Sequence, residues 1–203
     1  MANFAAIAVG ASVGGVQALI KLASDLPVDI PAALLVVQHV GPRHSFLPEL
    51  LSKAGPLPAL HAHNLTPIAP GCIFVAPPDH HMTALDGLLR TSRGPRENWA
   101  RPAIDPLFRS VAKAYGAKSV GVILTGGLND GTAGLYLLRK AGGIAVVQQP
   151  GNAECAEMPT SALRYAGADY CVVLDEVAPL LVTLARKIAT GREPEALLEG
   201  EQR

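Results

Sequence analysis

The chain has 203 residues, of which 49% are hydrophobic, and this is enough for one domain with a sizeable buried core. Lys and Arg together number 17, as do Asp and Glu, and no block of like charge marks a nucleic-acid-binding surface. No apolar run approaches the roughly 18 residues of a membrane span and no signal peptide opens the chain, so we expect a cytoplasmic protein without membrane insertion.

The N-terminal part of the chain predicts a strand, a tight turn, a helix and a second strand. An apolar run at 5–11 leads into a glycine-rich loop, and apolar residues then follow at helical spacing from Val16 to Leu22. A second apolar run at 32–39 comes one crossover later, which is typical of a right-handed βαβ unit. We expect its two parallel strands to be buried on both faces.

The pattern changes between residues 66 and 92. Two apolar stretches, at 72–78 and 88–92, flank a polar segment that contains Asp86-Gly87, a pair that favours a hairpin turn. We therefore expect an antiparallel hairpin insertion near residues 66–92.

The rest of the chain alternates between apolar runs and helical patterns. The runs lie at 119–125, 143–149 and 170–175, and the helical patterns at 104–116, 130–141 and 177–190. This alternation predicts an α/β fold with a doubly wound, mostly parallel sheet in three α/β/α layers. We assign residues 1–190 to a single domain and 191–203 to a polar C-terminal tail.

Ligands of open α/β sheets bind outside the carboxyl ends of the strands. The first strand ends in Gly10-Ala11-Ser12-Val13-Gly14-Gly15, where Ser12 is placed beside unpaired N–H groups at a helix N-terminus. This loop alone fits three interpretations: a dinucleotide- or phosphate-binding turn, a nucleophilic serine, or a simple helix cap.

The end of the second strand favours the nucleophile. A dinucleotide site needs Asp or Glu there to hold the ribose, and this chain has Gln38 and His39. A third strand ends in a glycine-rich loop that leads to Asp130, for which a helix N-cap is the structural alternative. Ser12, His39 and Asp130 at one sheet edge form the set that nucleophilic acyl transfer requires.

Other polar clusters carry less information. His61 with His63, and the pair His80-His81, lack a carboxylate or cysteine cluster beside them, so we interpret them as surface histidines. The three cysteines form no CxxC pair and are interpreted as buried small residues. We expect no metal and no organic cofactor.

Seven motifs in the same order, from Ile7 to about Leu174, resemble the catalytic domain of chemotaxis protein-glutamate methylesterases. They are Gly10-Ala-Ser12-x-Gly-Gly15, Val37-Gln38-His39, Pro70-Gly71 with Ala76-Pro77-Pro78-Asp79-His80, Arg101-Pro102-x-x-Asp105-Pro106-Leu107-Phe108, Gly121-Val-x-Leu-Thr125-Gly126, Asp130-Gly131 and Met158-Pro159.

The resemblance implies a role for each matched residue. Ser12 would be the nucleophile, His39 the general base and then acid, and Asp130 the carboxylate that orients the imidazole. For the oxyanion we expect the backbone N–H groups of Val13 and of the Gly126-Gly127 loop, with Gly127 as the second donor. Substrate-binding roles are expected for two further residues, Arg101 and Asn129.

The implied substrate is a methylated glutamate on the cytoplasmic helices of a chemoreceptor, with deamidation of receptor glutamines as a second activity. Typical members also carry an N-terminal receiver domain, whereas this chain starts at the catalytic motifs, so we expect any regulator to act in trans. The chain reads Gly127-Leu128 where the family usually has Met-Gly, which predicts an altered pocket. The alternative from another class is a catalytically silent nucleotide-binding, phosphate-binding or scaffold module of the same fold.

Overall fold

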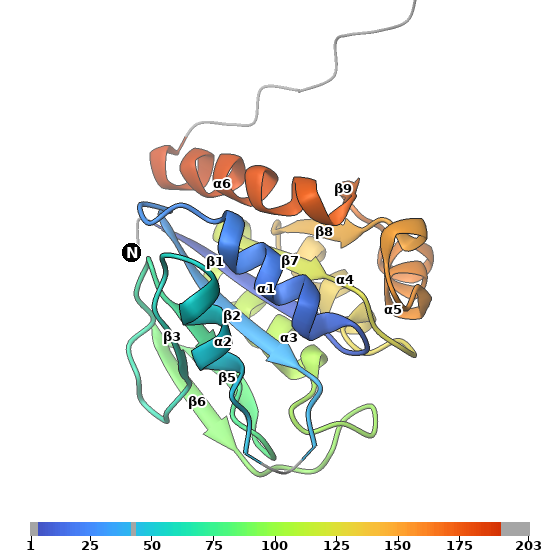
Figure 1. Ribbon diagram of the computed structural model, residues 1–203, viewed down its shortest axis with the longest axis horizontal. Helices are drawn as coiled ribbons and strands as arrows, with labels where there is room; N and C mark the ends of the chain where they lie inside the picture. The colour runs from blue at the N-terminus through green and yellow to red at the C-terminus, as the bar shows by residue number, and fades with distance from the viewer. Residues whose placement is uncertain (1–3, 42–43, 192–203) are drawn as a thin grey trace, which may run out of the picture.

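A computed structural model describes residues 4–41 and 44–191 (Figure 1). Its main sheet has seven strands in the order β3-β4-β2-β1-β7-β8-β9, and every pairing within it is parallel. The strands are β1 (Ala5–Ala11), β2 (Ala32–Gln38), β3 (Ala59–His61), β4 (Ile73–Val75), β7 (Ser119–Ile123), β8 (Ile144–Gln148) and β9 (Tyr170–Val172). The predicted doubly wound α/β class is confirmed.

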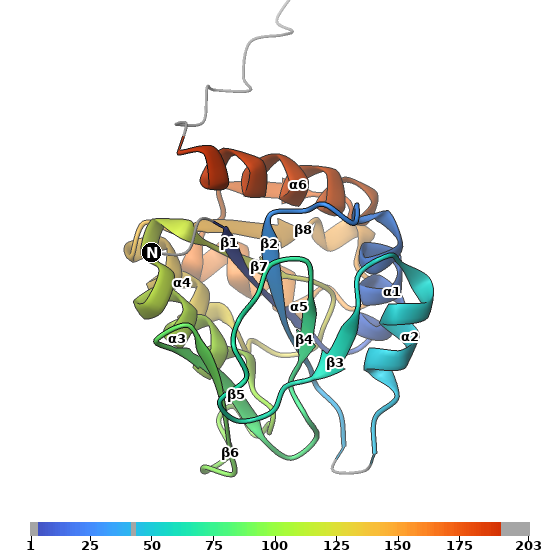
Figure 2. The same cartoon turned by 90° about the vertical axis from the view of Figure 1, so that its left-hand side faces the viewer.

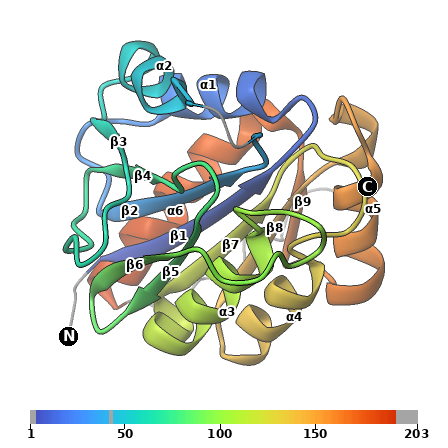
Figure 3. The same cartoon turned by 90° about the horizontal axis from the view of Figure 1, so that it is seen from below.

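Helices cover both faces of the sheet (Figures 2 and 3). They are α1 (Gly15–Asp25), α2 (Leu47–Ala54), α3 (Ile104–Tyr115), α4 (Thr132–Lys140), α5 (Glu157–Ser161) and α6 (Leu174–Thr190), with short turns η1 (Gly116–Lys118), η2 (Pro150–Asn152) and η3 (Ala162–Ala166). α1, α2 and α6 pack on one face, and α3, α4 and η3 pack on the other.

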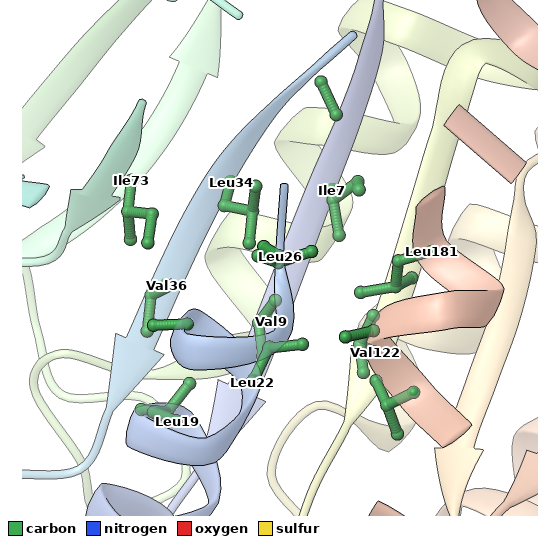
Figure 4. Close-up of a cluster of buried hydrophobic side chains, with 14 of the residues drawn as sticks. Ile7, Val9, Leu19, Leu22, Leu26, Leu34, Val36, Ile73, Val122 and Leu181 are labelled. Atoms are coloured by element: carbon green, nitrogen blue, oxygen red, sulfur yellow. The ribbon is translucent and has the colours of Figure 1, made fainter. Parts of the chain in front are cut away.

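The residues of the central strands alternate between two apolar cores. Ile7 and Val9 of β1 point into the core under α1 and α6, where Leu22 and Leu181 meet them (Figure 4). The intervening Ala6 and Ala8 belong to the core under α3 and α4. All seven residues of β1 are buried, as the uninterrupted apolar run predicts.

The antiparallel insertion is smaller than the expected span of 66–92. It is a separate two-stranded sheet of β5 (His81–Leu85) and β6 (Leu88–Ser92), and its turn residues Asp86 and Gly87 have φ values of 52° and 75°. Such values are those of the predicted two-residue turn. Ile73–Val75 does not belong to the insertion, because it pairs in parallel with β2 and β3.

Two interpretations of side-chain burial are wrong. His81 is buried rather than on the surface, since its Nε2 bonds the Pro95 carbonyl and its Nδ1 accepts the Ala103 N–H. The cysteines are not buried as expected either, since Cys171 is exposed and Cys72 and Cys155 are half-buried. Of the expected polar tail, residues 192–203 lie outside the described residues. No helix among the residues described is both long and apolar enough to span a membrane.

Candidate active site

Three adjacent strands deliver the polar side chains that the sequence singled out. Ser12 directly follows β1 and His39 directly follows β2, while Asp130 lies in the loop between β7 and α4. β1 is hydrogen-bonded to both β2 and β7. The register continues into the loops, where His39 N–H bonds the Ala11 carbonyl and Ser12 N–H bonds the Thr125 carbonyl, both at 3.0 Å. The fold thus brings Ser12, His39 and Asp130 together.

Their side chains form a continuous hydrogen-bonded chain. His39 Nδ1 lies 3.1 Å from Ser12 Oγ, and His39 Nε2 lies 2.7 Å from Asp130 Oδ2. Because the carboxylate only accepts, the proton of a neutral imidazole is placed on Nε2. Nδ1 then presents its lone pair to the serine hydroxyl, which is the arrangement that a general base needs.

Asp130 is only 2% exposed and is surrounded by donors. Besides His39, Oδ2 accepts the Ile104 N–H at 2.7 Å, while Oδ1 accepts Asn98 Nδ2 at 2.6 Å and the N–H groups of Asp105 and Gly131. Burial alone would raise the pKa of this carboxyl. The hydrogen bonds from His39, Ile104 and Asn98 outweigh burial and hold the pKa of Asp130 below its ordinary value of 3.8.

The structural alternative for Asp130 was a cap on the helix that follows it, α4, and the structure does not show such a cap. The N-cap of α4 is Gly131 and makes no side-chain capping bond. Asp130 instead binds the first N–H groups of α3, and Asp105 in the first turn of α3 accepts the Gly134 N–H of α4 at 2.6 Å. The two helices therefore exchange caps, which fixes the Asp130 carboxylate against α3.

Asn98 links these two carboxylates and was not predicted from the sequence. Its Nδ2 group donates to Asp130 Oδ1 and, at 2.8 Å, to Asp105 Oδ2. Burial raises the pKa of Asp105, and the nearby Asp130 charge raises it further, while Gly134 N–H and Asn98 act in the opposite direction. Asp105 lies within a matched motif, but nothing in the spacing of Asn98 indicated this contact.

The backbone N–H groups of Val13 and Gly127 have no hydrogen-bond partner within the described part of the chain. The neighbouring Gly126 N–H is bonded to the Cys155 carbonyl, and the Leu128 N–H to Glu157 Oε2. An oxyanion donor was expected from the Gly126-Gly127 loop. Of its two backbone N–H groups, only that of Gly127 is free, among the residues described, to donate to a developing oxyanion.

An open cleft of about 610 Å³ lies over these groups. Ser12, His39 and Asp130 line it together with Val13, Gly127 and Asn129. Leu128, at the position where an altered pocket was predicted, also lines it, as does Trp99, which was not predicted. Asn129 is exposed at its edge.

Arg101 also lines the cleft, but Asp79 Oδ1 already binds its Nε and Nη2 at 2.9 and 2.6 Å, and the Gly94 carbonyl binds Nη1. These bonds leave its guanidinium largely committed to holding the wall of the cleft.

Within residues 4–41 and 44–191, no group of three or more His, Cys, Asp or Glu side chains is arranged to hold a metal ion.

Comparison with known proteins gives the family. The model of the CheB methylesterase family matches residues 7–181. This chain belongs to the CheB methylesterase family. A crystal structure of the CheB methylesterase catalytic domain from Thermotoga maritima superimposes with a TM-score of 0.85 at 29% identity, covering 89% of this chain and 98% of that one.

Curated relatives agree with this membership. A Leptospira interrogans protein, provisionally named protein-glutamate methylesterase/protein-glutamine glutaminase, is 37% identical over 90% of this chain and 95% of its own length. A relative of the same activity name from Anaeromyxobacter dehalogenans is 42% identical over 89% of this chain, which spans 54% of that protein. The resemblance drawn from the sequence motifs is confirmed.

Proposed function

We propose that this CheB-family chain is a cytoplasmic serine hydrolase that removes methyl groups from glutamate methyl esters on the cytoplasmic helices of chemoreceptors. The observation that carries the proposal is the hydrogen-bonded chain from Ser12 Oγ through His39 to Asp130 at the base of an open cleft. The activity named for its relatives supplies the substrate class.

The geometry leads to an acyl-enzyme mechanism. His39 Nδ1 takes the proton from Ser12 Oγ as the oxygen attacks the ester carbonyl, and Asp130 stabilises the resulting imidazolium through Nε2. The imidazolium then protonates the departing methoxide, which leaves as methanol. A water molecule, deprotonated by the same nitrogen, hydrolyses the acyl-serine and leaves a glutamate carboxylate on the substrate.

The tetrahedral intermediates need donors for their oxyanion. The N–H groups of Val13 and Gly127 flank Ser12 and have no partner among the residues described, so no internal bond has to break before they donate. Attack on a glutamine amide would use the same groups and release ammonia, in line with the second activity in the relatives' names.

Two further assignments complete the proposal. Residues 1–190 act as the catalytic unit. A separate regulator acts on it in trans.

Methanol release from a methylated receptor fragment tests the activity. We expect the wild-type chain and Ser24→Ala, a control at an exposed serine on α1, to release methanol, and Ser12→Ala to release none. The thermal midpoint of Ser12→Ala should remain within about 2 °C of wild type, because this side chain buries little apolar area. An inactive wild-type chain, or an active Ser12→Ala variant, would refute the proposal.

A further inference from the structure

Figure 3 shows where α4 and α5 lie in the fold. A second groove, lined by residues of α4 and of the α5–η3 segment, lies beside the catalytic cleft. It has a volume of about 750 Å³ and is lined by Asn98, Asn129, Tyr136, Leu137, Ser161 and Tyr165, among others. We call it the α4 groove. None of the catalytic steps above uses its apolar side chains.

The α4 groove adjoins the catalytic cleft. Asn98 and Asn129 line both hollows, so the two share one wall. A chain segment that presents a side chain to Ser12 can therefore extend along the enzyme surface toward the α4 groove. A methyl ester on a helix requires such an extension, because the helix carrying it must lie along the enzyme surface.

The groove exposes large apolar side chains on one face. Tyr165 is 66% exposed, Tyr136 45% and Leu137 44%. At the mouth of the adjoining cleft, Trp99 is 91% exposed and Leu128 68%. Exposed clusters of this kind mark interaction surfaces, and tyrosine and tryptophan are the side chains most enriched at them.

Both tyrosines of the groove carry a cation on the ring. Lys140 Nζ lies 5.5 Å from the Tyr136 ring centroid, and Arg164 Cζ lies 5.4 Å from that of Tyr165. Among the described residues, neither cation forms an ion pair with a carboxylate. The one acidic side chain lining the groove, Asp105, is 6% exposed and is occupied by Gly134 N–H and Asn98. The rim is therefore aromatic and positively charged.

We propose that the α4 groove docks the acidic, amphipathic helix of the receptor that carries the methyl ester. This inference rests on the proposed function. Each turnover converts a neutral ester into a carboxylate on the same helix, so the substrate surface becomes more acidic as the reaction proceeds. The cations on the groove match that charge, and the apolar stripe of the helix matches the exposed tyrosines and Leu137.

The first test separates docking from chemistry. Tyr165→Ala and Tyr136→Ala are compared with wild type on a methylated receptor fragment and on p-nitrophenyl acetate, which is too small to reach the groove. We expect kcat/KM on the receptor to fall at least about tenfold, mainly through KM, while turnover of the small ester changes less than about twofold. Leu85→Ala, at a side chain 44% exposed on the β5–β6 hairpin, is the control and should behave as wild type on both substrates.

The second test addresses the charge. The double variant Lys140→Glu/Arg164→Glu should have a kcat/KM on the receptor at least about tenfold below that of wild type. Added salt should lower the wild-type kcat/KM, and it should lower that of the double variant less. Unchanged receptor kinetics in both sets of variants would overturn the docking proposal while leaving the esterase activity established.

Two other outcomes would also overturn it. An equal loss on the receptor and on the small ester would make the groove a structural support of the cleft. A wild-type dimer in sedimentation that dissociates in Tyr165→Ala, with unchanged receptor kinetics, would assign the groove to a second copy of the chain. If the wild-type chain releases no methanol from any methylated receptor, the proposed function itself fails, and that result is distinct from these.

Discussion

The substitution Asp130→Asn exchanges a carboxylate oxygen for an amide NH₂ group in a site that contains only donors. Oδ1 accepts hydrogen bonds from Asn98 Nδ2 and from the N–H groups of Asp105 and Gly131, whereas Oδ2 accepts from His39 Nε2 and the Ile104 N–H. Whichever way the new amide turns, its NH₂ group faces donors.

The two orientations differ in cost. An NH₂ group at the Oδ1 position opposes two backbone N–H groups that have no alternative, at about 1–3 kcal/mol each. At the Oδ2 position it opposes only one backbone N–H, that of Ile104, because the imidazole of His39 can move its proton to Nδ1 and accept at Nε2. We therefore expect the second orientation and a loss of about 1–3 kcal/mol in the free energy of unfolding.

This orientation disables the base. With its proton on Nδ1, His39 donates toward Ser12 Oγ and can no longer accept the serine proton. The equivalent change in a serine protease lowers kcat about 10⁴-fold, and we expect a loss of that order here. Methanol release and urea denaturation measure the two effects, and ¹⁵N chemical shifts of the imidazole report the tautomer. Asp86→Asn, at an exposed turn, is the matched control.

Two results would refute this reasoning. Turnover by Asp130→Asn within tenfold of wild type would remove the carboxylate from the mechanism. A large loss of activity with the His39 proton still on Nε2 would show that the loss arises from something other than the tautomer.

Three further predictions concern the surroundings of the triad. In Gly126→Ala the new methyl group would lie 2.8 Å from Ser12 Cβ and closer still to Met158 Sδ. We expect the free energy of unfolding, measured by urea denaturation, to fall by about 1–3 kcal/mol and kcat to fall as well. A wild-type kcat would contradict the contact. Asn98→Ala removes one bond to the Asp130 carboxylate and should lower kcat more than it raises KM on p-nitrophenyl acetate; the reverse would give Asn98 a role in binding. The pKa of Asp130 lies below its ordinary value of 3.8, so the ionised carboxylate stabilises the fold at pH values above 3.8. This stabilisation is lost as the pH falls from about one unit above 3.8 through the folded-state pKa. The free energy of unfolding should therefore decline less steeply with falling pH in Asp130→Asn than in wild type, and equal slopes for the two proteins would contradict the pKa shift.

The meeting of Ser12, His39 and Asp130 could be predicted because it depends on strand ends. Ser12, His39 and Asp130 each follow an apolar run, and parallel strands place their carboxyl ends at one edge. The position of Gly127 in the cleft with Ser12 could be predicted for the same reason. The short strand Ile73–Val75 was misassigned because three apolar residues beside a hairpin signal carry no information about which sheet they join.

Contacts between loops could not be predicted from the sequence. Asn98 and Trp99 lie between β6 and α3, both at positive φ, and no periodicity fixes where such residues point. The ion pair between Arg101 and Asp79, which comes from a distant loop, could not be predicted either. Such pairings depend on the folded positions of two irregular segments, which local propensity does not encode.

Covalent labelling of the nucleophile tests the central claim most directly. The chain is treated with a fluorophosphonate at neutral pH and digested, and the adduct is located by mass spectrometry. A serine activated by His39 should carry the adduct at Ser12 in the wild-type chain, and the His39→Ala variant should carry none. A wild-type chain left unlabelled, or one labelled at Ser12 equally well without His39, would contradict the account.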